Sequence, residues 1–354
     1  MTPRWYPLRL STPVARHVFG GRAIADRLGR RGLPAGRIAE TWEVSDVDGR
    51  GAEVVAGPLA GRTLRELTRA HPDELVGPGW RGDRFPLLTK FIDGTGMLPV
   101  HVHADDETAR RLEGEPNGKT EAWHVLDAAP GATAFIGTRE GVDRAELRSA
   151  LLAEDFGSVL RELPLRPGDT VYVPGRTPHS FGPDALIHEI EQTSDIQQHA
   201  MPWNMQDGSP VDPEQRRANV ERLLDEWDPA ARPHPTPGLR LPPSGDADRV
   251  LCCAGPHFAL ERWRLGTGTE RELPAGRVLL LSNAGGVARV RSAGGDDELE
   301  PGRTLLLPAA LERASITGPA DVLLGYLPDL DRDVRRPLLA AGYGPEAIAA
   351  LHGG

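Results

Sequence analysis

The sequence predicts a mainly β protein with a jelly-roll barrel, helical insertions and a second β-barrel domain. Short alternating strands dominate from Phe85 to Asp195, which is typical of a jelly roll. Prolines crowd the segment that follows residue 228, and strand-like patterns resume beyond it. The length of 354 residues allows two such domains. We therefore expect a first domain over residues 1–228, a linker over 229–248 and a second domain over 249–354.

The first domain also contains elements outside the barrel strands. An alternating pattern predicts a strand over Ile38–Asp46, and a helix-like run covers Arg22–Arg30. Thr63 is the predicted N-cap of a short helix. Glu40 and Glu43 lie on the predicted strand, where a role in lining a pocket and a place as exposed strand carboxylates both remain open.

Periodicity also predicts the helical insertions and the second barrel. Helical patterns cover Arg144–Leu152, Phe156–Leu160, Glu214–Trp227 and Asp329–Leu351. In the second domain, strand patterns cover Phe258–Trp263, Val278–Leu281, Val287–Val290 and Gly302–Ala309. The last of these segments mirrors the Gly168–Gly175 hairpin of the first domain. The second domain lacks a His-x-His motif, so we expect a barrel without a metal site.

Four metal-ligating side chains gather in the first barrel. His101 and His103 are two residues apart on a predicted strand, so both imidazoles face the same side. Glu121 follows a turn-rich break, and His179 comes directly after the Gly168–Gly175 hairpin. Three imidazoles and a carboxylate can enclose a divalent transition metal and leave room for water or substrate. This order of ligands resembles that of the cupins.

Two lysines and a second carboxylate lie in the same region. The chain has 41 Lys and Arg residues, of which only Lys90 and Lys119 are lysines. Lys119 precedes Glu121 by two residues and is expected to share its inward face. On the strand Ala185–Glu191, either His188 or Glu189 must point inward with His179, and Glu189 is the best remaining carboxylate for acid–base work. A buried ion pair with an Arg is the alternative role for Glu189. His124, which faces opposite to its neighbour Trp123, is assigned no role.

Composition excludes several classes of protein. The net charge is −10, and no basic block is dense enough to indicate nucleic-acid or membrane binding. No apolar run is long enough to span a bilayer, and the N-terminus lacks the apolar core of a signal peptide. Cys252 and Cys253 are adjacent and cannot form an ordinary structural disulfide. We expect a cytoplasmic enzyme or binding protein.

Segments along almost the whole chain resemble the mannose-6-phosphate isomerases, particularly the short bacterial form. The matching segments are Phe19–Gly21, Glu40–Asp46, Gly57–Gly61, Lys90–His103, Gly118–Glu121, Pro174–His179 and Glu189–Asp195. The resemblance implies a double-stranded β-helix core with a second cupin-like domain. It also implies a zinc ion held by Gln, His, Glu and His, at the positions of His101, His103, Glu121 and His179.

Three positions depart from the family pattern. His101 stands where the family has Gln, which replaces a neutral oxygen donor with a nitrogen donor, a change that suits zinc, iron, manganese or nickel. Phe19 replaces a Trp before Gly-Gly. His199 replaces an active-site Arg, a fixed cation that can bind phosphate or stabilise an enediolate.

The resemblance implies an aldose–ketose isomerase that converts mannose 6-phosphate to fructose 6-phosphate, or acts on a related sugar phosphate, through a cis-enediol. The expected catalytic residues are Lys119, Glu189 and His199, and the expected substrate-binding residues are Phe19, Glu40 and Lys90. Two alternatives remain open. One is another metal-dependent cupin enzyme, such as an iron dioxygenase or an epimerase on a modified sugar, and the other is a non-catalytic sugar-binding cupin. The expected partner is a small sugar or sugar phosphate, and monomer and homodimer are both open.

Overall fold

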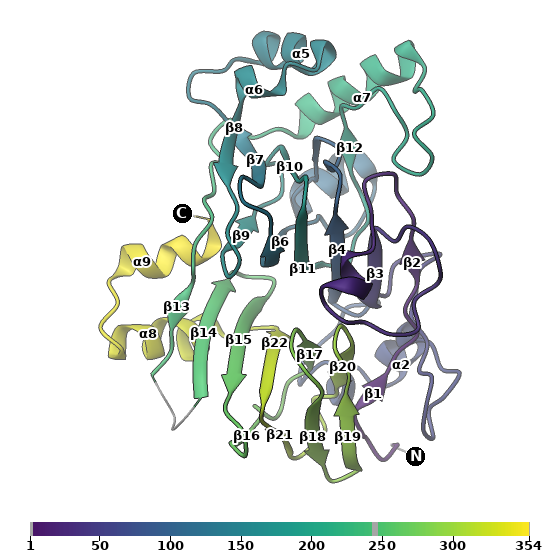
Figure 1. The fold of residues 1–354 in the computed structure, drawn as a ribbon, viewed down its shortest axis with the longest axis vertical. Helices are drawn as coiled ribbons and strands as arrows, with labels where there is room; N and C mark the ends of the chain where they lie inside the picture. Colours follow the sequence, from purple (N-terminus) through teal and green to yellow (C-terminus); the bar gives the residue numbers. More distant parts are fainter. Residues whose placement is uncertain (1–2, 243–246, 354) are drawn as a thin grey trace.

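The computed structural model describes residues 3–242 and 247–353, which form four antiparallel sheets. The six-stranded sheet has the order β2 (Val14–Ala15), β3 (Glu40–Val44), β4 (Leu87–Gly94), β11 (Ala185–Gln192), β6 (Glu121–Ala128), β9 (Thr170–Val173). The five-stranded sheet has the order β12 (Gln198–His199), β5 (His101–Val102), β10 (His179–Phe181), β7 (Thr133–Thr138), β8 (Leu160–Pro164). These two sheets form the predicted first barrel (Figure 1).

Two further sheets form the second barrel. The seven-stranded sheet has the order β1 (Leu8–Arg9), β20 (Thr304–Leu307), β17 (Leu279–Asn283), β22 (Ala320–Tyr326), β15 (Ala259–Leu265), β14 (Ala247–Ala254), β13 (Leu239–Arg240). The four-stranded sheet has the order β16 (Glu270–Glu272), β21 (Ala314–Thr317), β18 (Ala288–Ser292), β19 (Gly295–Leu299). The prediction of a mainly β protein with two barrels is confirmed.

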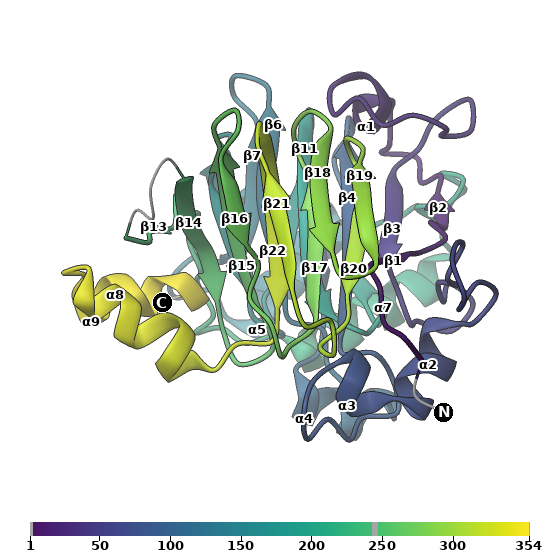
Figure 2. The same cartoon turned by 90° about the horizontal axis from the view of Figure 1, so that it is seen from below.

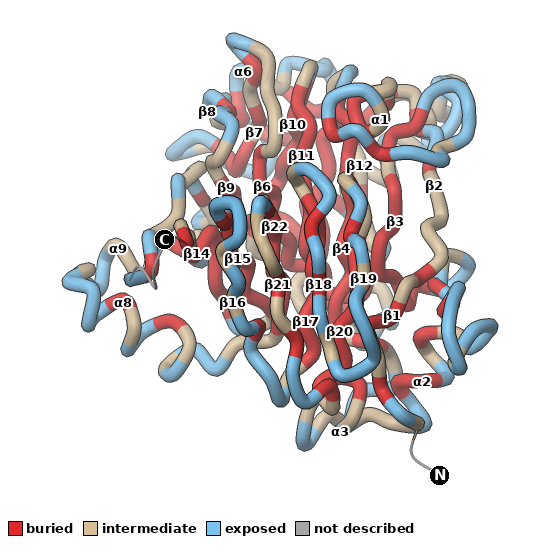
Figure 3. The backbone as a smooth tube through the Cα atoms, turned by 60° about the horizontal axis from the view of Figure 1, so that its bottom comes forward, coloured by how far each residue is buried: buried red, intermediate tan, exposed pale blue. Residues whose placement is uncertain are grey.

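Hydrophobic clusters show that the four sheets are stacked as layers. One cluster, including Ile136 and Ile187, lies between the five-stranded and six-stranded sheets. A second, including Ile190 and Leu280, lies between the six-stranded and seven-stranded sheets, and a third fills the second barrel. Because β11 is covered on both faces, all eight of its residues are buried. Figure 3 shows this burial along the central strands, whereas β18 on the outside alternates buried and exposed residues and β19 is largely exposed.

The two barrels share backbone pairing and buried polar contacts. Strand β1, from the predicted first domain, pairs with β20 of the second barrel. Across the interface, His188 Nε2 lies 3.0 Å from Ser282 Oγ. Within the predicted linker, β13 joins the seven-stranded sheet, and residues 243–246 lie outside the described residues. The domain boundaries at 228 and 249 stay a prediction.

The helices lie outside the sheets. They are α1 (Ala23–Asp26), α2 (Leu64–Ala70), α3 (Pro72–Leu75), α4 (Asp106–Thr108), η1 (Ala109–Glu113), α5 (Arg144–Ala153), α6 (Phe156–Val159), α7 (Pro213–Glu226), η2 (Leu330–Arg335), α8 (Arg336–Ala340), α9 (Pro345–Ala349) and η3 (Ala350–His352). Figure 2 shows α8 and α9 beside β14, and α2, α3 and α4 below the sheets. None of the described helices combines the length and apolar character that crossing a membrane requires.

Capping explains where two of the predicted helices begin and end. Thr63 forms the predicted N-cap of α2, accepting a hydrogen bond from the backbone N–H of Glu66, whose side chain accepts in return from Thr63. The helix predicted over Arg22–Arg30 is regular only as α1, because Gly29 adopts a left-handed φ of 79° and the chain turns there.

Glu226, at the C-terminal end of α7, predicts a dependence of stability on pH. Its side chain is buried, and Oε2 has no hydrogen-bond partner among the described residues. Burial, reinforced by the nearby Glu113, raises the pKa of Glu226 from 4.5 to about 8. Between these two values the folded chain holds a proton that the unfolded chain has lost, so the free energy of unfolding falls as pH rises.

We expect Glu226→Gln, which cannot ionise, to remove this contribution. The variant should be more stable than the parent by on the order of 1–3 kcal/mol at pH 8 and close to it at pH 5. Urea unfolding at both pH values measures the difference. An equal change in stability at the two pH values would show that Glu226 does not carry the proton.

Candidate active site

The four predicted metal ligands meet between the two sheets of the first barrel. His101 and His179 are direct cross-strand partners on β5 and β10, and Glu121 begins β6 in the facing sheet. His103 lies just beyond β5, and its ring centroid is 4.7 Å from that of His101. One ligand atom from each of the four side chains lies within 4.8 Å of all the others. All four residues are buried.

Backbone carbonyls orient the three imidazoles. The Nδ1 atoms of His101, His103 and His179 each donate a hydrogen bond to a carbonyl, at 2.7, 2.8 and 2.7 Å respectively. Nδ1 must carry the proton because a carbonyl only accepts, so Nε2 has a free lone pair. Burial lowers the pKa of His103 to about 3 and that of His101 well below 6.5. The imidazoles of these two residues are thus neutral, the form that binds metal.

The carboxylate of Glu121 completes the donor set. Its Oε1 accepts a hydrogen bond of 2.7 Å from Trp123 Nε1. Burial alone would raise the pKa of Glu121, but the positive charge of Lys119 outweighs burial and holds this pKa well below 4.5. The buried Nε2 atom of His179 has no hydrogen-bond partner among the described residues, and such an orphaned atom is costly unless a ligand satisfies it. The four residues therefore fit a divalent metal ion.

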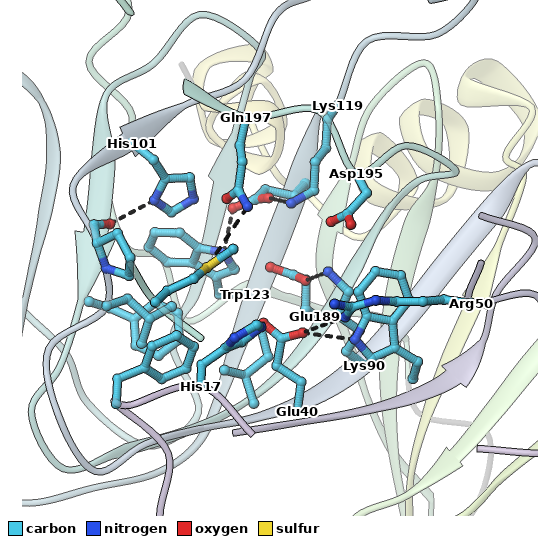
Figure 4. A pocket seen from close by; sticks show the side chains of 18 residues that line it. His17, Glu40, Arg50, Lys90, His101, Lys119, Trp123, Glu189, Asp195 and Gln197 are labelled. Carbon is cyan, nitrogen blue, oxygen red and sulfur yellow. Dashed lines mark hydrogen bonds and ion pairs between the residues drawn. The ribbon is translucent and has the colours of Figure 1, made fainter. Parts of the chain in front are cut away.

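A row of side chains crosses the six-stranded sheet beside this cluster. Strand register aligns Trp42 with Lys90, Lys90 with Glu189, and Glu189 with Trp123. Residues opposite one another in a sheet share a face, so all four side chains line the same pocket. Figure 4 shows Glu189 and Lys90 within it. Glu189, not His188, is the inward residue of β11, since His188 contacts the second barrel.

Buried ion pairs connect both lysines to carboxylates. Lys90 Nζ lies 3.0 Å from Glu189 Oε2 and 2.7 Å from Glu191 Oε1. Lys119 Nζ lies 3.0 Å from Glu191 Oε2 and 3.2 Å from Glu121 Oε2. Burial opposes the charge of Lys119, but Glu191 and Glu121 outweigh burial and raise its pKa. Glu191 thus holds both lysines of the chain in place. Sequence reasoning missed it, although it lies two residues after Glu189 and so shares its face.

The predicted substrate-binding residues Phe19 and Glu40 also line the pocket. Phe19 reaches it because Gly20 packs so closely that a Cβ there would lie 2.5 Å from the Cα of Ala39. Glu40 Oε2 accepts a hydrogen bond of 2.8 Å from Trp42 Nε1, and Glu40 Oε1 lies 3.9 Å from His17 Nε2. The pocket therefore combines an apolar wall with a fixed carboxylate.

His199 takes a different place. It is the cross-strand neighbour of His101 on the edge strand β12, and burial lowers its pKa. It is not among the residues that line the pocket, and the catalytic role expected for it stays a prediction. A cation that the sequence did not indicate, Arg50, does line the pocket, together with Asp195 and Gln197. Arg50 lies in the turn after β3, where no periodic pattern predicts the direction of a side chain.

Comparisons with curated proteins point to one family. The chain is 27% identical to a probable mannose-6-phosphate isomerase of Bacillus subtilis (strain 168), over 91% of this chain and 99% of the relative. It is 29% identical to the mannose-6-phosphate isomerase of Streptococcus mutans, over 90% of this chain and 98% of the relative. No protein-family model matches the sequence.

Comparisons with solved structures also find mannose 6-phosphate isomerases. The fold matches the mannose 6-phosphate isomerase from Bacillus subtilis with a TM-score of 0.79 at 26% identity, covering 90% of this chain and 99% of that chain. The apo form of a Salmonella typhimurium mannose 6-phosphate isomerase matches with a TM-score of 0.67 at 15% identity, over 91% of this chain and 99% of that chain, which supports the fold alone.

Proposed function

The chain belongs to the mannose-6-phosphate isomerase family, and from that premise we propose that it interconverts mannose 6-phosphate and fructose 6-phosphate. The observation that carries the proposal is the buried cluster of His101, His103, Glu121 and His179 at one end of a pocket that also contains Lys119 and Glu189. This arrangement places metal ligands and proton-transfer groups around one small volume. The oligomeric state, monomer or homodimer, stays a prediction.

Isomerisation requires only proton movements within the substrate. A proton leaves C2 while the C1 oxygen gains one, which gives a cis-enediol, and a proton then returns to C1 while the C2 oxygen loses one. We assign the carbon-bound proton to Glu189, a pocket carboxylate held by Lys90 at 3.0 Å. Burial raises the pKa of Glu189, although Lys90 opposes this, and a raised pKa suits a carboxylate for taking and returning a proton.

Lys119 is assigned to the substrate oxygens. Its Nζ lies 3.2 Å from His103 Nε2 and 3.2 Å from Glu121 Oε2, so a substrate oxygen close to the ligand cluster would also be close to this ammonium group. The ammonium can donate a hydrogen bond or a proton to an oxygen that gains negative charge. A divalent ion held by His101, His103, Glu121 and His179 would supply a Lewis acid that polarises the substrate oxygens.

The remaining predicted residues are given supporting roles. Glu40 would accept hydrogen bonds from sugar hydroxyl groups, and Phe19 would pack against the carbon skeleton. Lys90 is buried and already paired with Glu189 and Glu191, so we assign it to positioning Glu189 and not to direct substrate contact. For the metal we propose zinc, which favours nitrogen and carboxylate ligands in four-coordinate sites. Manganese, iron and nickel are the alternatives that a third imidazole permits.

An assay with mannose 6-phosphate tests the proposal. Purified protein, stripped with a chelator and reloaded with zinc, manganese, iron or nickel, should form fructose 6-phosphate, and the stripped protein should not. In D₂O the product should gain deuterium at C1 to the extent that the transferred proton exchanges with solvent. A panel of other hexose and pentose phosphates establishes the substrate range. Absence of isomerisation with every metal, or oxygen consumption with iron, would reject the isomerase.

A further inference from the structure

Arg50 is the cation of the pocket that is least engaged by other protein groups. Its guanidinium stacks 4.5 Å from the centroid of Trp42 and its side chain is 34% exposed. The nearest carboxylate is Glu40, at 4.0 Å. Among the described residues, the Arg50 side chain donates no hydrogen bond within the distance that defines one. Five N–H donors are therefore available for a ligand.

The two lysines of the pocket, unlike Arg50, are already paired with carboxylates. Lys90 and Lys119 are buried, and each pairs with two carboxylates at 3.2 Å or less. Lys90 packs against the Trp42 ring as well, at 4.4 Å from its centroid. A phosphate group would have to compete with these carboxylates for either ammonium, whereas Arg50 could bind it without losing any short contact.

Arg50 also lies at the end of the pocket where a phosphate group remote from the reacting carbons is expected. Figure 4 shows His101 and Arg50 on opposite sides, with Glu189 between them. A hexose 6-phosphate reacts at C1 and C2 and carries its phosphate on C6, at the far end of the carbon chain. If C1 and C2 lie by the His101 end, the phosphate extends toward Arg50.

We infer that Arg50 binds the phosphate of the substrate and sets the preference for phosphorylated sugars. This inference rests on the proposed function, because it takes the reacting carbons to lie by the metal ligands. A guanidinium can bind phosphate through two parallel hydrogen bonds, and stacking on Trp42 fixes its plane. Glu40 and Asp195 line the same pocket, and the charge of Arg50 would offset the repulsion between these carboxylates and a phosphate group.

Binding of a substrate analogue that cannot react tests the inference. A hexitol 6-phosphate has no carbonyl group and cannot be isomerised, and the matching hexitol lacks only the phosphate. Calorimetric titration of the metal-loaded protein should show that Arg50→Gln weakens binding of the hexitol 6-phosphate by about 10–100-fold, as expected for loss of hydrogen bonds to a charged group. Binding of the hexitol should change less than about threefold.

Two further variants distinguish the contribution of the Arg50 charge from that of its planar shape, and both from non-specific effects of removing an arginine. Arg50→Lys keeps the charge but loses the planar fork, so its affinity should lie between those of the parent and Arg50→Gln. Arg27 is a partly exposed arginine that lies outside the pocket and pairs with Asp127 at 3.2 Å. The Arg27→Gln variant should bind the hexitol 6-phosphate as tightly as the parent does. The inference would be overturned if Arg50→Gln weakened binding of the hexitol 6-phosphate and of the hexitol equally, or weakened binding of neither.

Turnover separates this inference from the proposed function. If the parent isomerises mannose 6-phosphate, Arg50→Gln should lower kcat/KM for the phosphorylated sugar by about 10–100-fold and leave that for mannose nearly unchanged. Equal losses for both sugars would instead place Arg50 at the reacting carbons and overturn the inference. If the parent binds the hexitol 6-phosphate through Arg50 but isomerises no sugar phosphate, the phosphate site stands and the isomerase does not.

Discussion

Replacing His103 or His179 with alanine is expected to abolish metal retention and isomerase activity together. Each residue presents Nε2 to the cluster while its Nδ1 is fixed by a backbone carbonyl, at 2.8 and 2.7 Å. Removing a ligand should cost more than the 10–100-fold loss of affinity that typically follows loss of an outer partner. Metal analysis after dialysis, and the rate of fructose 6-phosphate formation, measure the two effects.

A histidine outside the pocket provides the control. His352 is exposed near the C-terminal end of the chain, and His352→Ala should keep its metal and its activity. Thermal unfolding of the metal-stripped proteins shows whether a variant is folded before metal is added. One metal ion per chain retained by folded His103→Ala and His179→Ala would disprove the ligand assignment.

Changing Lys119 to arginine is expected to lower kcat by about a hundredfold or more while metal stays bound. Arginine keeps the charge, but its planar guanidinium cannot present N–H donors at the position of the compact ammonium. The site is also tightly built, since Lys119 is buried and pairs with Glu191 and Glu121 at 3.0 and 3.2 Å. A larger planar group cannot occupy it without displacing these carboxylates.

Lys119→Met separates loss of the ammonium from crowding, because methionine has nearly the same length without the charge. Both variants should retain metal and lose kcat. A rise in KM with kcat largely kept would assign Lys119 to substrate binding instead. Full activity in both variants would leave Lys119 without a catalytic role. Circular dichroism and metal content confirm that each variant is folded and loaded.

The sequence alone predicted the elements and the metal cluster because both depend on local periodicity. Alternation along a strand places His101 and His103 on one face, and the same rule places Lys119 on the side of Glu121. The structure brings the four predicted ligands together. It also confirms the N-cap at Thr63, which depends on side-chain chemistry within one turn.

The tertiary structure decided which residues from distant segments become neighbours. Strand register aligns Lys90 with Glu189, and the stacking of the two barrels turns His188 away from the pocket. The Glu191 carboxylate is important only because both lysines reach it, Lys90 from β4 and Lys119 from the segment that leads into β6. The position of Arg50 depends on a turn and on the face of Trp42. Such contacts depend on how sheets pair and pack, so neither composition nor the spacing of residues along the chain determines them.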